Sequence, residues 1–156
     1  AQSGTGNPRQ FRVKKIYWYI GAVLILVVAA VLTAVFYYQK VQNQNDLLKQ
    51  FPSFLVPQDG QVKAYKPEST EGYYLLKNQD LEEGITYQID KSLSDATKQV
   101  WTDLQNDGWI ASAGTTQGEG FKTFKVAKAQ EILFVKLEKQ GENSTQVKII
   151  NVKINK

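Results

Sequence analysis

The sequence predicts an α+β fold in which a single N-terminal transmembrane helix is followed by a small domain with one helix packed on a mostly antiparallel sheet. Two observations lead to this prediction. Residues 16–38 contain no charged side chain, and residues 58–156 alternate apolar and polar residues in short runs that one helical pattern interrupts. A helix packed across hairpin-connected strands is the arrangement that buries both apolar faces.

Residues 16–38 are long enough to cross a membrane. As a helix, these 23 residues extend about 35 Å, against a hydrocarbon core of about 30 Å. A cleaved signal peptide is the alternative, but its apolar stretch is only about 7–15 residues long and a small-residue cleavage site follows it. Aromatic rings suited to the headgroup layers stand at both ends: Tyr17, Trp18 and Tyr19 at one, Phe36, Tyr37 and Tyr38 at the other.

Residues 1–15 form a basic tail, which we expect to lack structure when it is isolated. The tail contains Arg9, Arg12, Lys14 and Lys15 and no acid, whereas the rest of the chain balances 15 basic against 15 acidic residues. Because basic segments stay in the cytoplasm, we expect a single-pass protein of the cell membrane with a cytoplasmic N-terminus and a periplasmic or extracellular C-terminal domain. The neutral outer part argues against nucleic acid as a partner.

Small residues follow one side of the expected span. Helical spacing places Ala22, Ala29 and Thr33 on one stripe, with Ala30 and Ala34 beside it. Small residues let membrane helices approach closely. The stripe is therefore our candidate contact with another integral membrane protein, while the Val and Leu sides face lipid; the alternative is that the alanines reflect ordinary composition.

Residues 39–57 are expected to connect the span to the outer domain. The segment 39–50 can continue the helix as a juxtamembrane extension, and Phe51-Pro52 ends it because proline disfavours a helical residue before it. Phe54, Leu55 and Val56 follow. Because they are apolar, we expect them to dock on the outer domain; the lipid surface and a partner protein are the alternatives.

Residues 58–156 are expected to form one extracytoplasmic domain with the element order β-β-β-α-β-β-β-β. Residues 115–120 are expected to form a loop. In the last strand the apolar residues Ile149 and Ile150 adjoin, where the alternation slips, so we expect a bulge there. Alternation places the strands at 61–66, 73–77, 85–90, 109–113, 121–128, 131–139 and 145–155.

The expected helix begins at Ser92, with Asp95 three positions later as in a capping box. Gly108 is its expected stop, within the run Leu104-Gln105-Asn106-Asp107-Gly108-Trp109. This L-x-x-x-G-W helix end between two runs of strands resembles small membrane-anchored extracytoplasmic domains of bacterial envelope proteins, whose functions are mostly unknown. The resemblance covers most of residues 58–156. It implies a bacterial envelope setting, with Trp101 and Trp109 in the core, and no particular activity.

Composition limits the chemistry of the chain. It contains no His and no Cys, which excludes a Ser-His-Asp triad, a thiolate metal site and imidazole ligation of haem. The acidic residues of 80–83 lack the spacing of a calcium loop, and the glycines of 114–120 lack the helix that follows a phosphate loop. The lysines of 122–139 alternate with apolar residues, which is typical of a solvated sheet face. We therefore expect that the chain is not an enzyme and that it has no catalytic residue, no metal site and no cofactor.

Three functions from different classes remain. The expected one is a single-span accessory or structural subunit that stabilises or caps an integral membrane protein complex, of which a respiratory or photosynthetic complex is one candidate. The alternative is a free-standing membrane-anchored binding module that recognises a peptide, lipid or glycan. An enzyme that uses carboxylates is the third. The expected partners are integral membrane protein subunits and the lipid bilayer.

Overall fold

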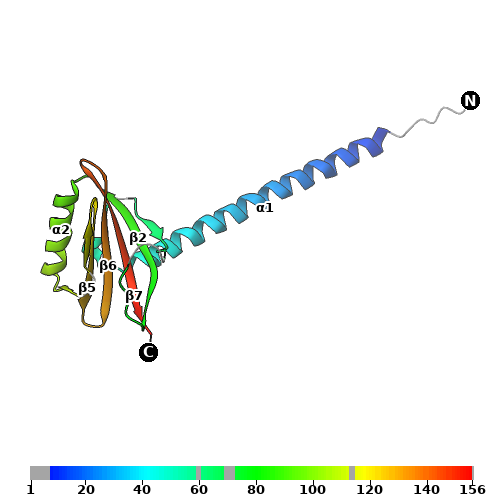
Figure 1. The fold of residues 1–156 in the computed structure, drawn as a ribbon. Coiled ribbons are helices and arrows are strands. Elements are labelled where there is room, and N and C mark those ends of the chain that lie inside the picture. The colour runs from blue at the N-terminus through cyan, green and yellow to red at the C-terminus, as the bar shows by residue number, and fades with distance from the viewer. Residues whose placement is uncertain (1–7, 59–60, 69–72, 113–114, 156) are drawn as a thin grey trace, which may run out of the picture. The chain divides into compact units, whose positions relative to one another are not determined.

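The computed structural model describes residues 8–58, 61–68, 73–112 and 115–155, with the backbone alone for residues 8–15. The chain divides into two compact units, residues 1–43 and 44–156, which are described separately below (Figure 1). We call the second unit the α+β domain.

Helix α1 (Pro8–Leu48) forms the described part of the first unit and continues into the second. Its segment Ile16–Leu48 is long and apolar enough to cross a membrane. The helix begins at Pro8, a residue that fits the first helical position because its φ is already set and its missing N–H is not needed there. Residues 8–15 of the basic tail thus belong to α1 in the whole chain, residues 1–7 lie outside the described part, and the expectation for the isolated tail stays a prediction.

The α+β domain contains a seven-stranded sheet of order β1-β2-β7-β6-β5-β3, with β4 paired to β5 (Figure 1). All these pairs are antiparallel. One helix, α2 (Leu93–Asn106), lies between β2 and β3 in the chain, so the expected α+β layout is confirmed. The strands are β1 (Lys63–Tyr65), β2 (Gln79–Ile89), β3 (Ile110–Ala111), β4 (Thr116–Gly118), β5 (Phe121–Lys128), β6 (Glu131–Gly141) and β7 (Ser144–Ile154).

The structure contradicts the sequence prediction at three places. Residues 73–77 are not a strand, and β2 begins at Gln79, where a loop of acidic residues was expected. Residues 116–118 were expected to lie in a loop but form β4, because a tight turn at Glu119-Gly120 folds them back on β5. Gly120 has a φ of 79°, which a residue without Cβ adopts at little cost.

One face of the sheet packs against α2 and is called the α2 face. The end of α1 and the short helix η1 (Ser53–Leu55) join this core through Leu47, Phe51 and Leu55. Docking is thereby confirmed for Leu55 and Val56, whereas Phe54 remains 37% exposed. The core therefore starts before residue 58. Its side chains that are at most 1% exposed include Ile85, Ala96, Leu104, Val126, Leu133, Val135, Leu137, Val147 and Ile149.

Both ends of α2 follow local sequence signals. The Ser92 Oγ accepts a hydrogen bond from the Asp95 N–H at 3.2 Å, which satisfies one free donor of the first turn. At the other end Gly108 has a φ of 86°. The N–H groups of Gly108 and Trp109 donate to the carbonyls of Gln105 and Leu104, the pattern of a Schellman stop. The predicted start and stop of the helix are confirmed.

The opposite face of the sheet, called the second face, is also buried. The extended residues Tyr73–Leu76, which we call the cover segment, lie over it: Tyr73 and Leu75 pack against a small core of Phe134, Ile150 and Val152. The rings of Tyr73 and Phe134 are 5.1 Å apart. A sheet covered on both faces buries consecutive residues of one strand. Ile149 is therefore buried on the α2 face and Ile150 on the second face, and the alternation of side chains along β7 is not interrupted.

The bulges lie in the two strands that flank β7, in β2 and between Lys139 and Gly141 of β6, and the prediction that placed a bulge in β7 is wrong. The register of β2 against β7 shifts between Leu81 and Gly84, where Glu82 and Glu83 lie opposite a single residue. Gly84 follows directly, and a Cβ there would stand 2.3 Å from the carbonyl oxygen of Ile149. The bulge thus brings the two backbones so close that β2 requires glycine at this position.

Candidate functional site

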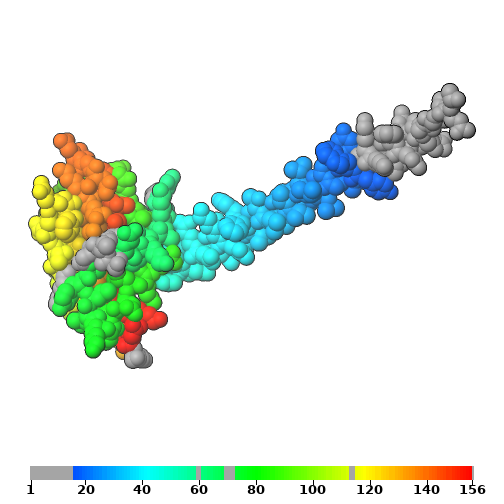
Figure 2. Space-filling model, turned by 45° about the vertical axis from the view of Figure 1, so that its right-hand side comes forward, coloured from blue at the N-terminus to red at the C-terminus, as the bar shows by residue number. Residues whose placement is uncertain are grey.

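The residues predicted to lie in the membrane are all on α1: two groups of aromatic residues and, between them, the stripe of small residues. The aromatic rings of residues 17–19 and 36–38 are exposed, and Figure 2 shows one side of this exposed helical surface. Thr33 Oγ1 donates to the carbonyl of Ala29 at 2.8 Å. Its hydroxyl is satisfied within the helix, so Thr33 can sit in an apolar environment beside the alanines. Residues 9, 12, 14 and 15 lie in α1, but their side chains are outside the described part.

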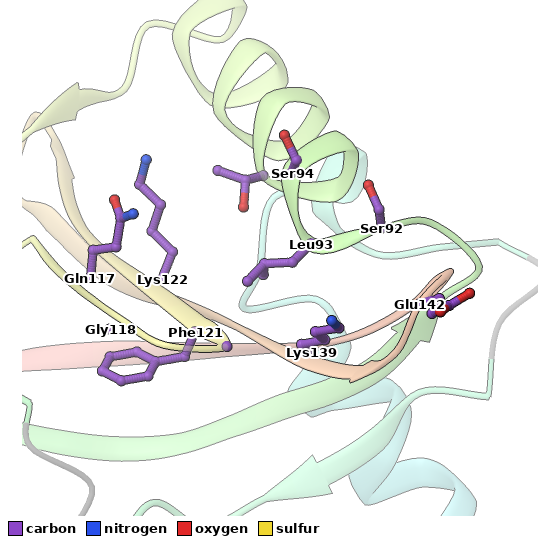
Figure 3. Close-up of a pocket in the computed structure, with 11 residues that line it drawn as sticks. Ser92, Leu93, Ser94, Gln117, Gly118, Phe121, Lys122, Lys139 and Glu142 are labelled. Atoms are coloured by element: carbon purple, nitrogen blue, oxygen red, sulfur yellow. The ribbon is translucent and has the colours of Figure 1, made fainter.

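A hollow of about 480 Å³ opens in the α+β domain between the first turns of α2 and the ends of β4, β5 and β6 (Figure 3). We call it the α2 hollow. Figure 3 shows Lys122 and Gln117 extending from the strands toward the side where α2 lies, whereas the Phe121 ring extends away from that side. The polar residues that line the α2 hollow are Ser92, Ser94, Thr97, Gln117, Lys122, Lys139 and Glu142.

Sheet register places the two lysines of the hollow on one face of the sheet. Lys122 pairs with Leu137, and Lys139 stands two residues further along β6, hence on the same face and on the diagonal. Diagonal neighbours stand about 7–8 Å apart, with their Cβ atoms somewhat closer. Among the described residues neither lysine forms an ion pair with a carboxylate. Lys122 Nζ instead lies 5.2 Å from the centre of the Phe124 ring.

The hydroxyl groups of the hollow differ in how well they are satisfied. Ser92 Oγ accepts from the Asp95 N–H and donates to the Asp95 carboxylate at 2.8 Å. Thr97 also lines the hollow, but its Oγ1 is buried and has no hydrogen-bond partner in the part of the chain that the structure describes. A buried hydroxyl without a partner is unfavourable. The hydrogen-bonding capacity of the Thr97 hydroxyl is therefore unmet among the described residues.

A second cluster of charges lies on the second face. Glu138 accepts from Lys136 Nζ at 2.7 Å and from Lys148 Nζ at 2.9 Å. Burial raises the pKa of Glu138, but the hydrogen bonds from the two lysines outweigh it and leave the pKa below its usual value. Lys148 Nζ also stands 4.9 Å from the centre of the Tyr65 ring. This bridge joins two lysines that face each other across β6 and β7, which would otherwise repel.

Lys125 fixes the cover segment to the second face. Only 2% of it is exposed, and its Nζ donates to Gln79 Oε1 at 2.8 Å and to the Tyr74 carbonyl at 3.1 Å. Burial lowers the pKa of the Lys125 ammonium group. Sequence alternation assigned this lysine to a solvated face, and that prediction is wrong because the cover segment lies over it.

A third polar group supports the end of α2. Asp107 accepts from Lys128 Nζ at 2.9 Å and from Trp109 Nε1 at 3.1 Å, and these hydrogen bonds, that from Lys128 above all, lower its pKa. Trp109 is 3% exposed, which confirms it as a core residue, while Trp101 is half-buried and stacks on Phe124 with ring centres 5.1 Å apart. The ion pair thus stabilises the fold at the helix stop.

Partial signals for the α2 hollow are present in the sequence. Ser92 was predicted only as a cap, and Lys122 and Lys139 only as members of a basic stretch. Lys122 stands two residues before Phe124, an apolar residue of the α2 face, and this parity is a signal that could have placed it there. The diagonal contact with Lys139 depends on the register of two strands, which the spacing of residues alone does not determine.

Comparison with protein-family models, with characterised proteins and with solved structures finds no match to this chain. The function of the chain is therefore inferred from its own residues.

Proposed function

We propose that this chain is a single-span membrane protein that serves as an accessory subunit of an integral membrane protein complex, with its α+β domain on the outer side. The observation that carries the proposal is the most apolar 18-residue stretch of α1, of which no residue is buried within the structure. Lipid or another membrane helix must cover such a surface. The absence of His and Cys from the chain favours a supporting role over a catalytic one.

The small-residue stripe supports a partner helix on one side of the span. Lipid tails are as apolar as leucine, so close packing rather than hydrophobicity holds two spans together. Ala22, Ala29 and Thr33 lie on one side of α1, and helical geometry places Val31 on nearly the opposite side. The hydrogen bond from Thr33 Oγ1 to the Ala29 carbonyl leaves this side without an unsatisfied donor.

The test compares two substitutions that both introduce leucine, one in the stripe and one on the opposite side of the helix. Ala29→Leu enlarges the stripe and should separate the chain from its complex, whereas Val31→Leu changes a lipid-facing position and should leave it bound. Blue-native electrophoresis in mild detergent reports both. Equal retention of the two variants would remove the stripe as the contact, and migration of the unaltered chain at monomer size would contradict the accessory role itself.

The orientation is proposed from the charge difference across the span. Four basic residues precede it, and Lys40 follows its other end. Protease added to intact spheroplasts should therefore remove the α+β domain and spare the basic tail. Protection of the domain under these conditions would reverse the orientation.

A membrane-anchored binding module is the second candidate, and the α2 hollow favours it. The hollow gathers two lysines without carboxylate partners in the described residues beside a helix N-terminus. A module of this kind would migrate alone in the electrophoresis experiment and would bind its ligand without any membrane partner. The two roles are thus separated by the size of the native species.

A further inference from the structure

We propose that the cover segment is a strap that opens and closes over the second face while the sheet stays folded, and that Lys125 is its latch. The inference does not depend on the membrane span or on the accessory role, because every group it uses lies in the α+β domain. Opening uncovers Phe134 and Ile150, whose side chains have no exposed surface when the cover segment is closed. The domain therefore has two surface states, and only the open one presents this apolar core.

Side chains, rather than strand pairing, attach the cover segment to the sheet. Residues 73–76 form no strand. Within the described residues, the one hydrogen bond to the backbone of Tyr74 and Leu75 comes from Lys125 Nζ. Tyr73 and Leu75 pack on the small apolar core, whereas Tyr74 and Leu76 are 55% and 51% exposed. A segment with so few buried contacts opens at a lower free energy than the strands beneath it.

Two side chains of the sheet form the latch. Gln79 Oε1 accepts hydrogen bonds from Lys125 Nζ at 2.8 Å and from the Leu76 N–H at 3.2 Å. Lys125 Nζ also donates to the Tyr74 carbonyl at 3.1 Å. Gln79 begins β2 and Lys125 lies in β5, so the latch ties the cover segment to two strands. Because three hydrogen bonds depend on two side chains, the latch can form and break as one unit.

The closed latch holds a positive charge without a carboxylate. Lys125 is buried and forms no ion pair within the described residues. Its hydrogen-bond partners are two neutral oxygens, and the rings of Tyr74 and Phe134 are centred 5.6 Å and 5.4 Å from Nζ. Neutral oxygens and ring faces offset only part of the cost of removing an ammonium group from water. Closing thus has an opposing cost at Lys125, which opening removes by rehydrating the charge.

Closure is consequently linked to pH. Burial lowers the pKa of the Lys125 ammonium group, which is about 10.4 for a lysine in water. Closure is therefore weakest while Lys125 is protonated, and it gains free energy as the pH rises through the lowered value toward about 10.4. From β2 the cover is latched by the neutral Gln79. The other titratable groups of the second face on the elements packed against Lys125 are, within the described residues, Tyr73 and Tyr74 of the cover segment and Lys136 and Glu138 of β6.

The first experiment measures opening by thiol labelling of the full chain in a neutral detergent. The chain contains no cysteine, so one introduced thiol reports its own exposure. Ile149→Cys and Ile150→Cys make the same change at neighbouring positions of β7, the first on the α2 face and the second under the cover segment, and both positions are 0% exposed. We expect Ile150→Cys to react about tenfold faster or more, because only it reacts through local opening.

Urea distinguishes local opening from unfolding in the same experiment. Local opening exposes little surface, so the labelling rate of Ile150→Cys should change little at low urea concentrations, whereas that of Ile149→Cys should rise steeply. A rate for Ile150→Cys that does not exceed that of Ile149→Cys, or that rises as steeply with urea, would overturn the strap.

The second experiment tests the latch through the pH dependence of labelling. Ile110→Cys, at a 68% exposed position, gives the intrinsic reactivity of a thiol at each pH, and the rate of Ile150→Cys divided by this value measures opening. The ratio should fall several-fold between about pH 8 and about pH 10 as Lys125 loses its proton. It should stay constant when Lys125→Met is added, and also with Lys125→Arg, which remains charged throughout. A constant ratio in the presence of Lys125, or an equal fall in either variant, would rule out Lys125 as the latch.

Discussion

The two faces of the sheet bury their residues by different physical means. On the α2 face, aliphatic side chains of the strands meet Ala96, Val100 and Leu104 of the helix, and most of these are fully buried. On the second face a smaller apolar core lies among lysines, of which Lys125 is 2% exposed. The first face is held mainly by removal of apolar surface from water, which depends little on pH.

The second face is held partly by charge. Lys136 and Lys148 share one carboxylate, and Lys125 fixes the cover segment through a backbone carbonyl and an amide. Buried charges are stable only while they are paired and hydrogen-bonded. The stability of the second face should therefore depend on pH, whereas that of the α2 face should not.

The largest expected effect is on the α2 face. Leu137→Ala removes a side chain with no exposed surface and should lower the free energy of unfolding by about 2–5 kcal/mol, through lost burial and the cavity left behind. Denaturant unfolding of the full chain, followed by near-ultraviolet circular dichroism, measures it. The loss should be the same at pH 4 and pH 8. Leu76→Ala, at an exposed position of the cover segment, is the control and should change little.

A smaller and pH-dependent effect is expected on the second face. Glu138→Gln leaves two lysines opposite each other without their shared carboxylate and should cost about 1–3 kcal/mol at pH 7. Because folding lowers the pKa of Glu138, its stabilising contribution is complete above the unfolded value of about 4.3. It is lost as the pH falls through the lower folded value.

The pH dependence is measured as a difference between two curves. Unfolding free energies of the unaltered chain and of Glu138→Gln should therefore converge in acid, while those of Leu137→Ala stay apart from the unaltered chain. Glu119→Gln, at an exposed turn position, provides the matched change of charge and should follow the unaltered chain. A Glu138 variant whose deficit persists at pH 2 would show that packing, not charge, governs this face.

Features that depend on a few neighbouring residues were predictable. The start of α2 at Ser92, its stop at Gly108 and the strands at 121–128 and 131–139 all follow from local spacing. The structure places them as expected, except that β6 continues to Gly141. Capping and Schellman contacts span only a few residues, so the sequence states them directly.

Features that depend on distant contacts were not predictable. Residues 73–77 alternate like a strand, but they cover a face instead of joining an edge, and the burial of Lys125 follows from that placement. The bulge at Glu82-Glu83 is defined only against β7, which lies far along the chain. The α2 hollow likewise requires the register of β5 and β6 together with the position of α2.

The smallest expected effect concerns how α2 is held on its face. Ser92→Ala removes the oxygen that accepts the Asp95 N–H and should cost about 1 kcal/mol. Ser92→Thr keeps a hydroxyl at the cap and should retain most of this stability. The first turn should fray before the rest of the α2 face opens. Amide hydrogen exchange should therefore speed up at residues 93–96 and remain slow at the second face, around Phe134 and Ile150. Faster exchange on both faces alike would mean that the two covers open as one unit and that their difference in chemistry does not make them independent.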